Sequence, residues 1–152
     1  TFQLLTQVAG RAGRGDSPGE VILQAFNTQH YAIECAKNHD YLGFYRQEMR
    51  MRRQGAYPPL GYMVTLLLTN EDESDVVQDS AFLAELLTGC LGTTAQLIGP
   101  TPCTVSKIKD SFRWQIIIKS KDRLQLRQAL RQALEQYNAS RRRTQVILEL
   151  DA

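Results

Sequence analysis

The run TVSKIKDSFRWQIIIK, residues 104–119, says more about the fold than any other part of the chain. Two stretches rich in β-branched and apolar residues, 104–109 and 113–119, flank a short polar break at Asp110-Ser111. This pattern predicts a β-hairpin, because strands favour such residues and turns favour Asp and Ser. A loop containing Gly99-Pro100 is predicted to precede the hairpin.

The register of this hairpin determines the position of Trp114, because a shift of one residue moves every side chain to the opposite face. A two-residue turn is expected to place Lys107 across from Trp114. A three-residue turn is expected to put Trp114 on the core face with Ile116 and Ile118. A tryptophan inside a run of isoleucines is more often a core residue, which favours the second arrangement.

Outside the hairpin, apolar runs at 62–69 and 145–150 predict two further strands. Two amphipathic helices lie between the strands, the first ending before Gly89 and the second capped by Asp122. The resulting order, β-α-β-β-α-β, predicts an α+β, ferredoxin-like (split βαβ) domain. The apolar positions are Val76, Val77, Leu83, Leu86 and Leu87 in the first helix, and Leu126, Ala129, Leu130, Ala133, Leu134 and Tyr137 in the second.

The first 60 residues have a different pattern. An apolar run at 21–26 predicts a buried strand, and residues 31–37 predict a short helix. Asp40 is a suitable N-cap for a helix over 41–54. This helix is expected to end before Tyr57-Pro58-Pro59, since a proline disfavours helical conformation in the residue before it.

The segment QVAGRAGR, residues 7–14, has the form Q-x-x-G-R-x-G-R. Its arginines, Arg11 and Arg14, are suited to phosphate because a guanidinium stays charged and offers a planar fork of donors. An arginine supplied in this way can stabilise the charge that develops during phosphoryl transfer. The alternative is a glycine-rich basic turn that only ends a helix.

This segment resembles motif VI of the superfamily 2 helicases, where the arginines reach the terminal phosphate of ATP. With the following GDSPGEV, NHDY at 38–41 and YPP at 57–59, the chain resembles the C-terminal part of the PriA (primosomal protein N′) family of bacterial replication-restart helicases. By this resemblance Arg11 and Arg14 are catalytic, and Gln7 and Gly10 contact the nucleotide.

The resemblance also implies an organisation for the chain. Residues 1–38 would be the end of the second, RecA-like helicase lobe, 39–56 a connector helix, and 57–152 a domain that binds DNA and partner proteins. The parent protein would be a cytoplasmic, ATP-dependent DNA helicase that uses ATP with Mg²⁺ in replication restart and primosome assembly. Zinc is expected only in its upstream region. Partners would be forked or single-stranded DNA, the tail of single-stranded DNA-binding protein, and other primosome proteins.

Several features are absent from the sequence. No Gly-Lys pair occurs, so the phosphate-cradling loop of an ATPase is missing and the chain alone is predicted not to hydrolyse ATP. Cys35, Cys90 and Cys103 are far apart, which predicts neither a disulfide framework nor a zinc site. The chain alone is expected to bind no metal or cofactor. No apolar run is long enough to span a bilayer.

The net charge of +2 conceals an asymmetry along the chain. Residues 1–103 carry 7 Lys and Arg against 11 Asp and Glu, whereas residues 104–152 carry 11 against 5. A basic C-terminal third predicts a polyanion or an acidic peptide as its partner. In the hairpin, the candidate DNA contacts are Lys107, Lys109, Arg113 and Trp114, because cations follow phosphates and aromatic rings stack on bases.

The second helix of the domain carries Arg123, Arg127 and Arg131 at intervals of four residues, beside its apolar stripe. Arg123 and Arg127 are predicted to bind an acidic peptide, by paired hydrogen bonds to carboxylates. The alternative is a solvated helix face. A further cluster, residues 141–143, is expected to lie in a loop.

A rival hypothesis makes the chain a free-standing, ferredoxin-like nucleic-acid-binding module without a motor. The segment at 7–14 distinguishes the two, because a module without a motor has no use for a motif VI.

Overall fold

The computed structural model describes residues 1–12 and 19–151. Of residue 151 it describes the backbone alone. The chain divides into two compact units, Thr1–Met51 and Arg52–Ala152. Each unit has its own apolar core, a small one in the first unit and a larger one in the second.

The first unit consists of helices α1 (Phe2–Ala9), α2 (Tyr31–Lys37) and most of α3 (Tyr41–Gln54). The predicted bounds of α2 and α3 are confirmed. Asp40 precedes α3 as expected, and its carboxylate accepts a hydrogen bond of 2.8 Å from the Gly43 amide. The small core joins all three helices through Phe2, whose ring stacks on Phe44 with 4.4 Å between the centroids.

The prediction of a buried strand at 21–26 is wrong. The segment has no strand structure, and Ile22 and Phe26 are fully or almost fully exposed. A strand is stable only when a neighbouring strand pairs with its backbone. All four strands formed by the described residues belong to the second unit, and none of them pairs with this segment.

The second unit consists of β1 (Tyr62–Asn70), α4 (Glu73–Cys90), β2 (Ala95–Ile108), β3 (Ser111–Ser120), α5 (Arg123–Ala139) and β4 (Gln145–Asp151). The strands form one sheet in the order β2-β3-β1-β4, and every neighbouring pair is antiparallel. This element order and strand order are those of the ferredoxin-like fold, so the predicted α+β class is confirmed.

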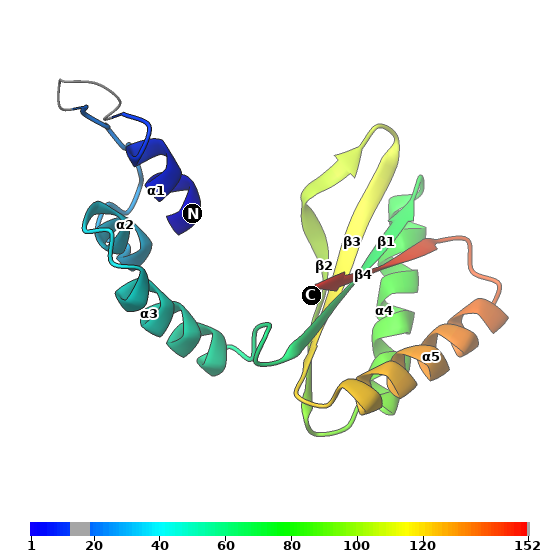
Figure 1. Ribbon diagram of the computed structural model, residues 1–152. Helices are drawn as coiled ribbons and strands as arrows, with labels where there is room; N and C mark the ends of the chain where they lie inside the picture. The colour runs from blue at the N-terminus through cyan, green and yellow to red at the C-terminus, as the bar shows by residue number, and fades with distance from the viewer. Residues whose placement is uncertain (13–18, 152) are drawn as a thin grey trace. The chain divides into compact units, whose positions relative to one another are not determined.

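Helices α4 and α5 lie on one face of this sheet (Figure 1). The buried residues of β1 and β3 on that face, such as Leu66 and Ile116, pair across the two strands and are inaccessible to solvent. Both helices begin at a capping aspartate, Asp72 for α4 and Asp122 for α5, whose carboxylate accepts two backbone amides. The buried core consists of Val64, Leu66, Leu68, Val76, Leu83, Ala84, Leu87, Ile116, Ile118, Leu126, Leu130, Ala133 and Tyr137.

The predicted loop at Gly99-Pro100 is wrong, because β2 begins at Ala95 and runs through it. Gly99 has φ of +100°, and a Cβ there would lie 2.8 Å from the Gln115 carbonyl oxygen. Only glycine adopts this conformation at little cost, so it allows the strand to continue through a bulge. The register with β3 shifts twice, between Ile98 and Thr101 and between Pro102 and Lys107.

The register of the hairpin differs from both predicted arrangements. The turn has two residues, as Ile108 pairs with Ser111, yet Lys107 pairs with Phe112 and not with Trp114. Trp114 pairs with Leu68 of β1 and packs against the core. The prediction that Trp114 faces the core is thus confirmed. This orientation follows from the pairing of Trp114 with Leu68 of β1 and not from the length of the turn.

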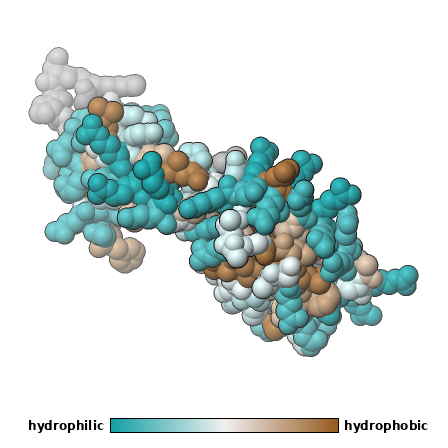
Figure 2. All heavy atoms as spheres, turned by 90° about the horizontal axis from the view of Figure 1, so that it is seen from below, coloured by the Kyte–Doolittle hydropathy of each residue, from teal (hydrophilic) through white to brown (hydrophobic). Residues whose placement is uncertain are grey.

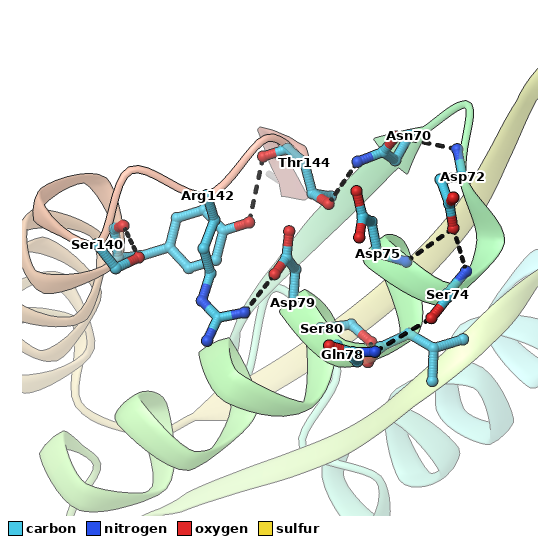
Figure 3. A network of polar contacts seen from close by, with 12 residues as sticks. Asn70, Asp72, Ser74, Asp75, Gln78, Asp79, Ser80, Ser140, Arg142 and Thr144 are labelled. Carbon is cyan, nitrogen blue, oxygen red and sulfur yellow. Dashed lines mark hydrogen bonds and ion pairs between the residues drawn. The ribbon is translucent and has the colours of Figure 1, made fainter.

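A polar network joins the start of β4 to helix α4 (Figure 3). The Arg142 Nη1 donates to the Asp79 Oδ1 over 2.5 Å, and its guanidinium lies 4.0 Å from the centre of the Phe82 ring. The hydroxyl of Tyr137 donates to the Thr144 carbonyl oxygen, while the Thr144 hydroxyl accepts from Asn70. The network fixes the loop between α5 and β4.

Apolar side chains also lie on the surface of the second unit. On the face that Figure 2 shows, apolar side chains of this unit lie between hydrophilic ones. Large apolar residues of this unit that are exposed are Tyr57, Leu60, Tyr62, Val77, Val105, Ile108, Leu124, Ile147, Leu148 and Leu150.

Candidate nucleic-acid and partner interface

The arginine motif begins on α1 and continues beyond it. Gln7 is exposed on this helix, and Gly10 follows its last residue in a right-handed helical conformation. Arg11 lies in the turn after the helix, with an exposed side chain. Arg14 lies outside the described residues. The structure therefore places three of the four predicted residues together on an accessible surface.

The tip of the β2–β3 hairpin is basic and exposed. Lys107 and Lys109 are both exposed, and Lys109 occupies the turn with φ of 54°. Arg113 is half-buried on the neighbouring strand. The Lys107 ammonium lies 4.5 Å from the centre of the Phe112 ring, so this ring forms a cation–π pair. These four residues bring positive charge and one aromatic ring to the same end of the sheet.

Trp114 lies further from the tip and packs against the core, as Phe112 also does. Both rings are half-buried, so neither offers a fully open face to a base at the hairpin. Phe112 is the aromatic residue nearest the tip, since it pairs with Lys107 one step from the turn. The sequence places both Phe112 and Trp114 close to the cations of the hairpin. Only the pairing of β2 with β3 shows that Phe112 is the ring nearer the tip.

Helix α5 exposes Arg123 and Arg127, and none of the ion pairs formed by described residues includes either one. Arg131, the next in the row, donates to Glu135 over 2.8 Å. The sequence predicted Arg123 and Arg127 as a pair one helical turn apart, and the helix places them so.

The flank of α5 that carries Arg127 faces away from α4. Gln132 and Gln136 line a groove of about 340 Å³ between α5 and α4. Nine residues, or about two and a half turns, separate Gln136 from Arg127, so their side chains leave opposite sides of the helix. Gln125 accepts a hydrogen bond from Thr94, in the loop before β2, which places the α4 flank toward the β2 side of the sheet. The arginine flank accordingly lies toward β4.

Two cations of the basic third are engaged within the fold. Lys119 is buried, with its ammonium 3.4 Å from the centre of the Tyr57 ring and 3.3 Å from the Gly55 carbonyl oxygen. Arg142 binds Asp79, as described above. Neither was predicted as a contact, and nothing local in the sequence reveals these partners, which are about 60 residues away.

The described residues offer no cluster of three or more His, Cys, Asp or Glu placed to hold a metal ion. Cys35, Cys90 and Cys103 are free thiols, and burial raises the pKa of Cys35 and of Cys103. Within residues 1–12 and 19–151, no helix has the length and apolar character needed to cross a membrane.

Comparison with known proteins gives consistent matches. The family model described as "Primosomal protein N C-terminal domain" matches residues 53–152. "Replication restart protein PriA" of Bacillus subtilis (strain 168) is 38% identical over 151 residues, which are 99% of this chain and 19% of that protein. The protein of the same name from Synechocystis is 39% identical over 118 residues, 78% of this chain and 14% of that protein. The Haemophilus influenzae protein is 29% identical over 150 residues, 98% of this chain and 20% of its own length. The chain thus spans about a fifth or less of these relatives.

Proposed function

The chain belongs to the primosomal protein N C-terminal domain family, and from this premise we propose that it acts in replication restart as the C-terminal part of a longer, ATP-dependent DNA helicase. The observation that carries the proposal is a similarity to replication restart protein PriA over 99% of the chain. This similarity includes the arginine motif, which supports a motor protein over a free-standing binding module.

In this proposal, Arg11 and Arg14 stabilise the terminal phosphate of ATP in the transition state, and Gln7 and Gly10 contact the nucleotide. The exposure of Gln7 and Arg11 supports such a role, since both side chains are accessible to a ligand or to another part of the protein. The rest of the ATP site, with Mg²⁺ and the phosphate-cradling loop, belongs to the longer protein, as does any zinc.

The hairpin tip is proposed to contact the phosphates of forked or single-stranded DNA. Lys107, Lys109 and Arg113 supply the charge, and release of counterions from the phosphates supplies much of the affinity. Trp114 and Phe112 are both half-buried against the core, and Phe112, which lies nearer the tip beside Lys107, is the ring proposed to contact bases in place of Trp114.

Arg123 and Arg127 are proposed to bind the acidic tail of single-stranded DNA-binding protein, which would recruit the helicase together with other primosome proteins. Two guanidiniums that lie one turn apart, and that pair with none of the described acidic residues, can each form charge-assisted hydrogen bonds with a carboxylate. Their position in the first two turns of α5 adds the favourable field of the helix N-terminus.

The proposal is tested by comparing DNA-stimulated ATP hydrolysis of the full-length protein with that of the 152-residue chain. We expect turnover by the full-length protein and none by the chain alone, because no Gly-Lys pair is present to build the phosphate loop. If the purified chain hydrolysed ATP and Arg11→Ala abolished this activity, the proposal that the chain supplies only part of the ATP site would be contradicted.

A further inference from the structure

The two edge strands of the sheet are protected to different degrees. In β2, Pro100 and Pro102 lack an amide donor, and two register shifts interrupt the strand. Prolines and bulges are the usual means of preventing a further strand from adding to an edge. In β4 there is no proline, and its pairing with β1 runs in one unbroken register from Met63↔Asp151 to Thr69↔Gln145.

The outer edge of β4 therefore has unused hydrogen-bonding groups. In an antiparallel ladder, every second residue of an edge strand directs its amide and carbonyl away from the neighbouring strand. Across the described part of the chain, residues 145–151 form no backbone hydrogen bond except those with β1. A peptide that lies alongside β4 could pair with these groups.

Exposed apolar side chains border this edge on both faces of the sheet. Leu148 and Leu150 pair with the buried Leu66 and Val64, so they lie on the helix-covered face, yet they are 39% and 71% exposed. Ile147 lies on the other face and is 40% exposed. These residues extend the core surface to the edge without a partner to cover it.

The charge beside this edge is positive on one face. Arg123 and Arg127 lie on the flank of α5 turned away from α4, which is the flank toward β4. Their guanidiniums have no acidic partner among the described residues. An occupant of the edge therefore meets apolar side chains on both faces, the exposed Glu149 beside Ile147 and, on the helix side, two cations that pair with none of the described acidic residues.

We propose that β4 accepts an extended, acidic and apolar peptide as a fifth strand of the sheet. The peptide backbone pairs with the outer edge of β4, its apolar side chains cover Ile147 on one face, and its carboxylates reach Arg123 and Arg127 on the other. This mode of recognition is strand addition, in which backbone hydrogen bonds give affinity and side chains give specificity. The inference rests on the proposed role of the two arginines and specifies how their ligand is held.

The test uses the 152-residue chain and a synthetic eight-residue peptide in which Asp and Ile alternate, so that all its carboxylates lie on one face of a strand. A second peptide of the same sequence carries N-methyl groups on alternate amides, which removes backbone donors and keeps every side chain. Affinities are measured by fluorescence titration, and amide hydrogen exchange of β4 is followed with and without peptide.

Two matched variants accompany these peptides. Leu150→Glu places a negative charge at the β4 edge, on the face proposed to receive the peptide's carboxylates, and Val105→Glu does so on the other edge strand at a similarly exposed position, 71% against 55%. Arg123→Ala/Arg127→Ala removes the two cations. Unchanged far-ultraviolet circular dichroism confirms that each variant is folded.

We expect the unmodified peptide to slow exchange at every second amide of β4, and the N-methylated peptide to bind about tenfold more weakly or worse, through the loss of backbone hydrogen bonds. Leu150→Glu weakens binding, because its carboxylate repels those of the peptide on the same face, and Val105→Glu does not. The double arginine variant weakens binding by about tenfold, because charge-assisted hydrogen bonds are lost.

The inference is overturned if both peptides bind equally well, or if β4 amides exchange at the same rate with and without peptide. Arginine-dependent binding in that case leaves the proposed partner site standing and removes only strand addition. Binding unaffected by the double arginine variant removes both. Slow exchange of β4 amides that depends on protein concentration in the absence of peptide would assign the edge to a second copy of the chain, which also overturns the proposal.

Discussion

The ion pair of Arg142 and Asp79 joins the loop before β4 to helix α4, and its contribution to stability can be tested. The side chain of Asp79 is 7% exposed and that of Arg142 is 32% exposed. Arg142→Met leaves a nearly buried carboxylate without its partner, so we expect a loss of about 2–3 kcal/mol in the free energy of unfolding. Urea denaturation measures this value. Arg141→Met, at an exposed neighbour, is the control and is expected to change stability by less than about 0.5 kcal/mol. Equal effects would contradict the account.

The titration of Tyr137 is expected to lower the free energy of unfolding at alkaline pH. Burial, followed by the negative charge of Asp79, raises the pKa of its phenol to about 12. The unfolded chain loses this proton near pH 10 and the folded chain only near pH 12, so stability is complete below pH 10 and falls between these values, by up to about 2.7 kcal/mol. Tyr137→Phe has no proton to lose. Its stability should fall less than that of the wild type over this range, and parallel curves would contradict the assigned cause.

At the residue scale, the sequence predicted local roles well. The cap at Asp122 is confirmed, since its carboxylate accepts hydrogen bonds of 2.9 and 3.0 Å from the amides of Leu124 and Gln125, and such a cap lies within three residues of its donors. The pairs Arg142 with Asp79 and Lys119 with Gly55 were not predictable. Their members are 63 and 64 residues apart, and only the fold brings them together.

At the scale of elements, the hairpin is the part that can be tested for DNA binding. Lys109→Glu reverses an exposed charge at its tip, and Lys121→Glu does so at the opposite end of β3. We expect Lys109→Glu to weaken single-stranded DNA binding and to reduce the slope of log affinity against log salt by about 0.7, the value for one phosphate contact. Charge reversal at Lys107, Lys109 and Arg113 together should reduce it by about 2.

The control, Lys121→Glu, should leave that slope unchanged. An equal effect from both single variants would mean that binding follows net charge and that the hairpin makes no specific contact. Filter binding of a labelled oligonucleotide at several salt concentrations provides the slopes.

Elements with a regular apolar period were predicted within a few residues, because the period follows directly from the geometry of a helix or strand. The predicted start of β2 was wrong, because Gly99-Pro100 has the composition of a loop. In the structure a bulge accommodates these two residues within the strand. The strand at 21–26 was wrong for the opposite reason. Its composition is that of a strand, but no described strand pairs with it.

At the scale of the whole molecule, the two units are expected to differ in independent stability. Residues 52–152 contain a core of 13 buried apolar residues, whereas the cluster in residues 1–51 has three. Chains with so small a core rarely fold alone. Expressed separately, residues 52–152 should unfold cooperatively on heating, and residues 1–51 should show little helical circular dichroism. A cooperative transition in residues 1–51 would contradict this.

The family and the order of elements could be predicted from the sequence, because motif and period are local features. The candidate site could be predicted only in part, since the exposure of a side chain depends on the register that packs Trp114 against the core and on the partner that binds Arg142.

The central claim is that this chain supplies the arginines of a helicase ATP site, and one measurement tests it most directly. In the full-length protein, DNA-stimulated ATP hydrolysis is measured for Arg11→Ala, for Arg14→Ala and for the control Arg50→Ala, at an exposed arginine of α3. An arginine that stabilises the transition state contributes about 10³–10⁵ in turnover. We therefore predict a loss of that order for Arg11→Ala, Arg14→Ala or both, with ATP binding retained and Arg50→Ala near normal. Near-normal turnover in both motif variants would contradict the claim.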